Sequence, residues 1–573
     1  MPGGSYLRTT RLGLLAATLL APAPAPAAPA PGPQVDAAEE VFSGTVQVSI
    51  VNVDVYVTDK TGNPVTGLTA GDFEVFDDGE PVEVTNFYAV ESGRPAPPAA
   101  PEPAAAEPAA RPGPIAAVPE ELPPEQQLRL IVFVDNFNIL PLERNRILPD
   151  LRTFILNLDE KAEVLLVTND RALNVRHPFT RDRHLIADAL LELEDLTGFR
   201  TAKDGERREA LRNIEDADDE PAALMWALNY AESEVVEVRD TISWLRDLLD
   251  SLAGLPGRKA LLHVSSGVPM VAGQELFEAV DVRFDNSRAL MAMGRYDVSR
   301  DYATLAVQAN AHRVSFYTLD AGGLRPDVFG GAEYTAIRSP GTRSRINSAA
   351  EANYQSSLRY LAERTGGRAI VNRNDVLPAL REVGAALETY YSLGYPEPLA
   401  GDGRYHRVEV KVNRPGVQVR HRDGYRSRSA RDRMIDRVRA ALAYTFVDNP
   451  LGVEARPGEA IRRSRNEYLV PVQVRIPLAN VVLLPQPDGK YEARLRLFVA
   501  AADDQERASG VEEVPIGFRL PAEHVEAARK ESYLHTHRLL MREGRQKVAI
   551  GVLDEIGAMH SVVSLPVRAG AAE

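Results

Sequence analysis

The spacing of polar and apolar residues divides the chain into stretches with different periods. Residues 41–91 and residues 467–567 repeat with period two, as half-buried β-strands do. Between them, unbroken apolar runs such as residues 128–134 (LRLIVFV) take turns with helical patterns. Strands that are apolar on both sides belong to parallel sheets covered by helices on both faces. The middle of the chain therefore predicts an α/β domain with a doubly wound, mostly parallel sheet.

We place this domain over residues 128–396. Residues 321–349 are rich in Gly, Ser, Arg and Pro, which predicts a long irregular connection that is either functional or disordered. The predicted strands are 128–134, 163–168, 172–178 at an edge, 259–265, 314–319, 368–371 and 390–395. The predicted helices are 142–158, 181–193, 204–252 with a break near Glu220, 287–311, 354–365 and 376–389.

The flanking stretches predict further units. Residues 41–91 are a small β module, and residues 92–127 are a disordered Pro/Ala-rich linker. Residues 397–429 read as a β-hairpin segment that we expect to pack on that module. Residues 430–447 form a linking helix, and residues 448–573 an Ig-like β-sandwich with six alternating segments.

The first residues resemble an export signal, which we assign to residues 1–28. Arg8 and Arg11 precede the apolar run 12–20, a small-residue cleavage site surrounds Ala27, and residues 29–40 are an Ala/Pro-rich spacer. No other run approaches the roughly 20 apolar residues that span a bilayer. We therefore expect an exported protein, periplasmic or extracellular, with no membrane span after signal cleavage.

The composition of the chain argues against several classes of function. The chain has 573 residues and a formal net charge of -15, which disfavours nucleic acid as a partner. It contains no cysteine, so thiol catalysis, a cysteine zinc site and a lipidated cysteine are all excluded.

Several phrases together resemble the von Willebrand factor A (vWA)-related domain family abundant in acidobacteria. They are DFEV at 72–75, VFVD at 132–135, GRKAL at 257–261, LAERTGGR at 361–368, YYSLGY at 390–395, YHRV at 405–408 and RDGY at 422–425. The resemblance covers about residues 45–425. It implies a vWA fold in an exported protein.

A vWA domain binds its metal through a DxSxS motif that begins at the aspartate after the first strand. Here the matching positions are Asp135, Phe137 and Ile139, so both hydroxyls are missing, and Asn136 and Asn138 are out of register. The second loop offers either Thr197 or Thr201. In the third loop Ser266 stands where the resemblance implies an aspartate. A single carboxylate with scattered hydroxyls is a poor ligand set for Mg²⁺, which requires near-octahedral oxygen coordination.

We therefore predict no cofactor, with Asp135 capping the next helix or accepting hydrogen bonds from loop amides. The alternative is metal-dependent adhesion, with Mg²⁺ or Mn²⁺ held by Asp135, Thr197 or Thr201, and Ser266.

The functional prediction is a non-enzymatic, adhesion-type protein that binds a protein partner at the carboxyl ends of the strands. A cell-envelope hydrolase is the other alternative. It lacks support because no GxSxG surrounds Ser265 and Ser266 and no HExxH motif occurs. The predicted binding rim consists of Asp135, Asn136, Asn138, Thr197, Thr201, Ser265, Ser266 and Asp320.

Overall fold

The computed structural model describes residues 50–91, 93–95, 126–285, 288–324, 340–398, 401–505 and 507–570. The predicted signal peptide, spacer and nearly all of the predicted linker lie outside the described residues, as do residues 41–49 of the predicted β module. In the described part of the chain, no helix is both long and apolar enough to cross a membrane.

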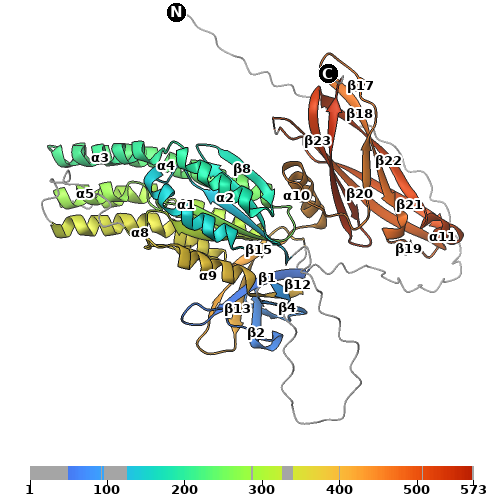
Figure 1. The fold of residues 1–573 in the computed structure, drawn as a ribbon, viewed down its shortest axis with the longest axis horizontal. Helices are drawn as coiled ribbons and strands as arrows, with labels where there is room; N and C mark the ends of the chain where they lie inside the picture. The colour runs from blue at the N-terminus through green and yellow to red at the C-terminus, as the bar shows by residue number, and fades with distance from the viewer. Residues whose placement is uncertain are drawn as a thin grey trace, which may run out of the picture. The chain divides into compact units, whose positions relative to one another are not determined.

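The central sheet has six strands, of which five run parallel and one edge strand runs antiparallel (Figure 1). Numbered along the chain their order is 3-2-1-4-5-6, the doubly wound order that places a ligand crevice at the strands' carboxyl ends. The α/β prediction is confirmed. In sheet order the strands are β8 (Leu173–Thr180), β7 (Glu163–Asn169), β6 (Leu128–Val134), β9 (Arg258–Ser265), β10 (Val314–Asp320) and β11 (Arg368–Ile370).

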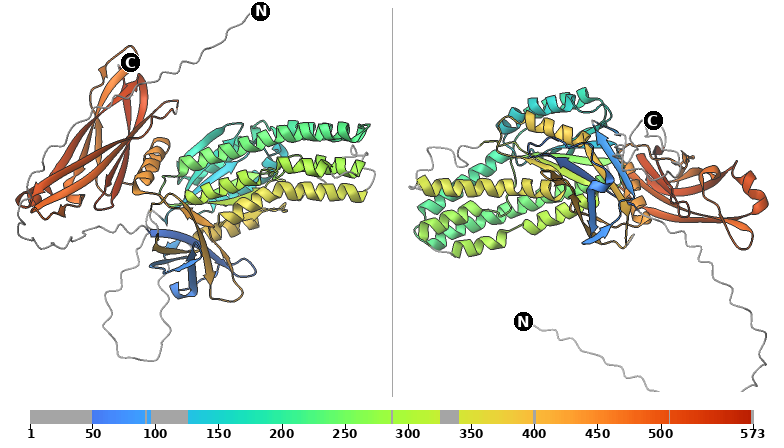
Figure 2. Two further views of the ribbon diagram at one scale, coloured as in Figure 1. Left: turned by 180° about the vertical axis from the view of Figure 1, so that it is seen from behind. Right: turned by 90° about the horizontal axis from the view of Figure 1, so that it is seen from below.

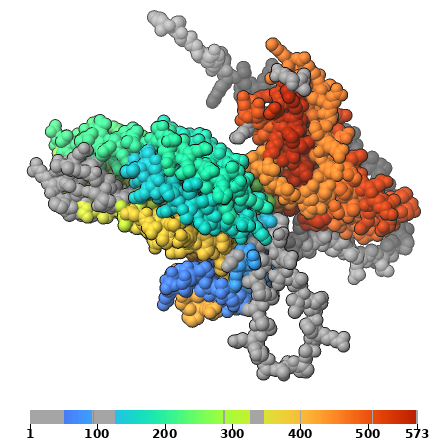
Figure 3. All heavy atoms as spheres, in the orientation of Figure 1, coloured from blue at the N-terminus to red at the C-terminus, as the bar shows by residue number. Residues whose placement is uncertain are grey.

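Alternate residues of each strand enter two separate cores. Leu130 and Val132 pack under α1 (Pro141–Leu156), α2 (Arg183–Glu192) and α9 (Leu377–Glu388). In Figure 3 the cyan-to-teal atoms of the first part of the α/β domain border the yellow-to-gold atoms of its last part. Ile131 and Phe133 face the opposite layer. That layer is built from α3 (Arg200–Asp216), α4 (Glu220–Leu252), α5 (Gln274–Phe284), α7 (Ser299–Ala311) and α8 (Pro340–Arg364).

Helices α3, α4, α5 and α8 extend past the carboxyl ends of the strands (Figure 2). The 33 residues of α4 correspond to about 50 Å of helix at 1.5 Å per residue. A seven-residue strand such as β6 spans only about 23 Å. These helices therefore form a helical extension over the crevice end of the sheet, and this extension determines what surrounds the predicted rim.

Three predictions for this layer are wrong. The predicted helix 287–311 is two helices, α6 (Arg288–Met293) and α7, separated by a 3-10 turn at Gly294–Tyr296. Helix α5 was not predicted at all. Residues 340–349, predicted to be irregular, form the first turns of α8. The local sequence is a poor helix former, but Ile346 and Ala350 are fully buried in the core, and such packing commonly supplies most helix stability.

The β module consists of two sheets around one apolar core. The first sheet is β14 (Gln418–Arg420), β1 (Ile50–Thr58), β12 (Tyr390–Pro396), β4 (Asn86–Glu91) and β5 (Arg94–Pro95). The second is β15 (Gly424–Arg426), β13 (Tyr405–Val412), β2 (Phe73–Asp77) and β3 (Glu80–Val82).

Two predictions differ from this arrangement. Strand 390–395 was assigned to the α/β domain, but β12 pairs with β1 and β4, because Tyr391, Leu393 and Tyr395 fill the core of the module. The segment 397–429 is not a hairpin, since β13 pairs with β2 and β15 whereas β14 pairs with β1 in the other sheet. The chain between them crosses from one sheet to the other.

The C-terminal part begins with α10 (Ala430–Ala443), whose Met434 and Val438 pack against Phe498 and Ala549 of the following sheets. Two antiparallel sheets enclose a shared apolar core. The specifically Ig-like assignment stays a prediction. One sheet contains β16 (Glu454–Pro457), β17 (Ile461–Arg462), β18 (Glu467–Pro477) and β22 (Ser532–Arg542). The other contains β19 (Leu484–Pro485), β20 (Lys490–Asp503), β21 (Glu512–Pro521), β23 (Gly544–Asp554) and β24 (His560–Ala569), and the short α11 (Val525–Ala528) lies between β21 and β22.

Candidate functional site

Asp135 lies directly after β6 at the crevice end of the sheet, and its side chain is fully buried. Its Oδ1 accepts a hydrogen bond from Asn169 Nδ2 at 2.9 Å. Its Oδ2 accepts from Asn138 Nδ2 at 2.9 Å and from Ser265 Oγ at 3.0 Å. Asn138 Nδ2 also donates to Thr241 Oγ1 of α4. The carboxylate is therefore held by donors from the loop after β6 and from the ends of β7 and β9, and Asn138 connects it to the helical extension.

This donor set does not fit a divalent cation. A metal ligand must direct lone pairs at the ion, whereas two amide N–H groups and one hydroxyl are directed at Asp135. The two missing hydroxyl positions are apolar in the structure as well. Ile139 is fully buried in the core beneath α1, and Phe137 is 7% exposed in an aromatic cluster.

The remaining predicted rim residues differ in their exposure and in their hydrogen-bond partners. Asn136 donates to Asp170 Oδ1 at 2.7 Å and to the carbonyl of Thr197 at 2.9 Å, so it joins the first loop to the second. The side chains of Thr197 and Thr201 themselves are exposed. Ser266 donates to Glu143 Oε2 at 2.5 Å. Asp320 accepts hydrogen bonds from the Gly322 amide and from Gln355 Nε2.

An aromatic cluster occupies the rim beside Asp135 and was not predicted. The Phe137 ring packs edge-on against Trp244 with centroids 5.7 Å apart and lies 6.0 Å from Phe199. The Arg171 guanidinium lies 5.6 Å from the Phe137 centroid and 5.1 Å from that of Phe199. Phe199 and Trp244 are partly exposed and Arg171 is exposed. The only sequence signal for this cluster is Phe137 itself, at a position where the resemblance implies serine.

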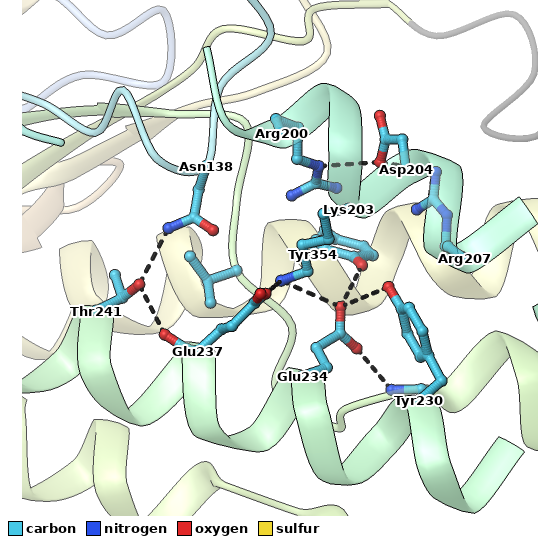
Figure 4. Close-up of polar contacts among 12 residues, drawn as sticks. Asn138, Arg200, Lys203, Asp204, Arg207, Tyr230, Glu234, Glu237, Thr241 and Tyr354 are labelled. Atoms are coloured by element: carbon cyan, nitrogen blue, oxygen red, sulfur yellow. Dashed lines mark hydrogen bonds and ion pairs between the residues drawn. The ribbon is translucent and has the colours of Figure 1, made fainter. Parts of the chain in front are cut away.

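A network of buried charges lies deeper, between α3, α4 and α8 (Figure 4). Lys203 Nζ lies 2.7 Å from Glu237 Oε2 and 3.5 Å from Glu234 Oε1. Glu234 accepts hydrogen bonds from the hydroxyls of Tyr230 and Tyr354 and, at 2.7 Å, from the Gly273 amide. Sequence reasoning missed this network because charged residues at helical spacing normally face solvent.

Two carboxyl groups of the network have pKa values that are shifted in opposite directions. Burial disfavours the charged form of Glu234 and would raise its pKa. The charge of Lys203 and the hydrogen bond from the Gly273 amide outweigh this effect, so the pKa of Glu234 lies below its usual value. Burial, with the neighbouring charge of Glu234, raises the pKa of Glu275 to about 7. Neither oxygen of Glu275 has a hydrogen-bond partner in the described residues, and its nearest cation is Arg207 at 3.9 Å. The network is therefore fully ionised only above neutral pH.

A second polar cluster lies in the β module around His406, which is 4% exposed. Its Nδ1 lies 3.0 Å from Asp78 Oδ2 and 3.8 Å from Asp77 Oδ1, and its Nε2 lies 3.2 Å from Asp402 Oδ1. Burial opposes the charged ring, but the hydrogen bonds to Asp402 and Asp78 outweigh it and raise the pKa of His406 above 6.5. The protonated ring can therefore donate from both nitrogens, to Asp78 and to Asp402.

We expect His406 to make stability pH-dependent. Its pKa is higher in the folded chain than the unfolded value of 6.5, so its contribution is complete below pH 6.5 and is lost as pH rises through the folded pKa. The difference in free energy of unfolding between wild type and His406→Gln should be largest near pH 6 and smaller at pH 8.5. Urea unfolding at both pH values measures it, and a pH-independent difference would contradict this assignment.

No family model matches the chain, and no curated protein matches it. Solved structures with partial similarity include an aerotolerance-related membrane protein from Bacteroides fragilis, with 9% identity over 45% of this chain and 98% of that chain at a TM-score of 0.23. The conserved hypothetical protein BatB from Bacteroides thetaiotaomicron has 11% identity over 45% of this chain and 98% of its own, at a TM-score of 0.21.

A von Willebrand factor type A structure from Catenulispora acidiphila has 8% identity over 78% of this chain and 66% of its own, at a TM-score of 0.21. With scores this low, the fold assignment rests on the strand order of the central sheet.

Proposed function

We propose that this chain is an exported, non-enzymatic protein of the adhesion type, whose vWA-like domain binds a protein partner without a metal ion. One observation supports the proposal above all. The Asp135 carboxylate accepts hydrogen bonds from Asn138, Asn169 and Ser265, which occupy it from within the protein. A bridging metal would have to displace these donors, and two of them are amide N–H groups that repel a cation.

The partner surface in this proposal is the aromatic cluster of Phe137, Phe199, Trp244 and Arg171, flanked by the exposed Thr197 and Thr201. Aromatic and arginine side chains dominate the energetic centres of protein interfaces, because they bury much area at low entropic cost. The buried members of the rim, Asp135, Asn136, Asn138, Ser265, Ser266 and Asp320, hold the loops beneath this surface.

The hydrolase alternative has little support in the geometry. Ser265 donates to Asp135, and His263 Nε2 lies 3.7 Å from the same carboxylate oxygen, so the aspartate stands between serine and histidine. A nucleophilic triad needs the histidine between the other two. All three side chains are at most 2% exposed, which also keeps substrate away.

The test is capture of partners from envelope extracts of the source organism. We expect Trp244→Ala and Arg171→Ala each to weaken capture at least about tenfold, as expected when an interface anchor is truncated. Arg456→Ala, at an arginine whose side chain is 81% exposed in the C-terminal sheets, should capture like wild type. Chelator should have no effect.

Capture that is unchanged by both rim substitutions would contradict the proposal that the aromatic cluster is the partner surface. Capture that requires Mg²⁺ or Mn²⁺ and is lost in Asp135→Asn would instead favour the metal-dependent alternative. Circular dichroism of each variant shows whether it is folded.

A further inference from the structure

A cavity of about 200 Å³ lies at the amino ends of the parallel strands, opposite the rim. Its walls come from β1, from the segments that precede β9 and β10, from the segment around β15 and from α10. Seven lysine and arginine residues line it, against two carboxylates, although the chain as a whole carries a net charge of -15. The cavity is therefore a concentrated positive region in an acidic protein.

Part of this charge is neutralised within the protein. Arg428 forms an ion pair with Asp436, and Arg437 Nη1 lies 2.7 Å from Asp448. Of the other five cations, we single out Lys259, Arg313 and Arg422, which make no salt bridge in the part of the chain that the structure describes.

The hydrogen-bond acceptors of Lys259 and Arg422 are neutral backbone carbonyl groups. Lys259 Nζ donates to the carbonyl of Leu255 at 2.8 Å. Arg422 Nη2 donates to the carbonyl of Asn52 at 2.8 Å, while its buried Nε has no acceptor among the described residues. Arg313 lies in the turn before β10, and its guanidinium donates to no group among the described residues. None of the acceptors is an anion.

The positive charges of these three side chains also repel one another. Burial, together with the charge of Arg313, lowers the pKa of Arg422 to about 10. Burial and then Arg313 likewise lower the pKa of Lys259 well below its usual value. Like charges that are wholly or partly buried and form no ion pair are costly, and an anion that enters among them would lower that cost and gain charge-assisted hydrogen bonds.

We propose that this cavity binds a small, multiply charged oxyanion, either inorganic phosphate or the phosphoryl group of a small metabolite, through Lys259, Arg313 and Arg422. The arginines suit such a ligand because the guanidinium fork matches phosphate oxygens in pairs. The volume admits a phosphate group and a few further atoms. This site is independent of the binding function proposed at the rim.

Such a ligand would join three parts of the fold. Arg422 lies between β14 and β15 of the β module, Lys259 is on β9 of the central sheet, and the α10 helix closes the cavity and leads into the C-terminal sheets. At Gly254 the backbone of α10 approaches so closely that an added Cβ would lie 2.1 Å from the Asp436 carbonyl. An anion at this junction would stabilise the contact of α10 with the α/β domain.

The experiment is calorimetric and thermal-shift titration of the purified full chain in Tris-chloride at constant ionic strength. Inorganic phosphate and glycerol 3-phosphate are the probes. We expect saturable binding with a rise in melting temperature for wild type and for the control Arg456→Gln. Arg313→Gln and Arg422→Gln should each weaken binding at least tenfold.

Arg313→Gln is the decisive variant, because Arg422 also holds the Asn52 backbone and its replacement could impair folding. Tighter binding of glycerol 3-phosphate would identify a phosphorylated metabolite as the ligand, and equal or tighter binding of phosphate would identify the free anion. No saturable binding of either probe to wild type, or unchanged binding to Arg313→Gln, would overturn the proposal.

Discussion

Arg258→Met is expected to lower the free energy of unfolding by about 3–5 kcal/mol, the usual cost of leaving a buried charge without its partner. Arg258 is 5% exposed and joins the central sheet to the β module. Its Nε lies 3.1 Å from Asp54 Oδ2, and its Nη2 donates to Tyr56 Oη at 2.8 Å. Its guanidinium also stacks 3.4 Å from the centroid of Tyr390. Urea unfolding followed by circular dichroism measures the loss.

The matched control is Arg456→Met, which removes an exposed arginine and should change stability by less than about 0.5 kcal/mol. The double variant Arg258→Met with Asp54→Leu should be more stable than the single variant, because no unpaired carboxylate remains. A loss below 1 kcal/mol for Arg258→Met would show that the module is held to the sheet by apolar contacts alone.

Glu234→Leu is expected to cost a similar 3–5 kcal/mol, since it leaves Lys203 and its neighbouring arginines with too little negative charge. The substitution also removes the acceptor for the hydroxyls of Tyr230 and Tyr354 and for the Gly273 amide. Thermal and urea unfolding at pH 8 measure this loss. Because Asn138 and Thr241 connect Asp135 to the same helix, we also expect weaker partner capture at the rim.

Glu275→Gln is the matched control on the adjacent helix. The pKa of Glu275 is raised from 4.5 to about 7 in the folded chain, so stability from this group is complete below pH 4.5 and falls as pH rises through 7. Removal of its charge at pH 8 should therefore be neutral or stabilising, in contrast to Glu234→Leu. Equal losses for the two variants would show that the network depends on shape and volume rather than on charge.

Local periodicity was sufficient for most of the elements. The apolar run that became β6 matches its predicted bounds of 128–134, and the six long C-terminal strands all occur where alternation places them. Failures occurred where packing overrides local preference. The first turns of α8 are helical because Ile346 and Ala350 are buried, and β12 joins the β module because its tyrosines complete that core.

The same distinction between local sequence and tertiary packing applies to the candidate sites. From the sequence alone follow the α/β class, the place of Asp135 at a strand end and the apolar residues Phe137 and Ile139 where the resemblance implies serine. Each of these depends on residues that are neighbours along the chain. The folded structure was needed to show that Asn169 and Ser265 donate to the Asp135 carboxylate, that Trp244 packs against Phe137, and that Lys259, Arg313 and Arg422 line one cavity. These partners lie tens to hundreds of residues apart, and no periodic signal encodes which distant side chains a fold brings within a few ångströms of each other.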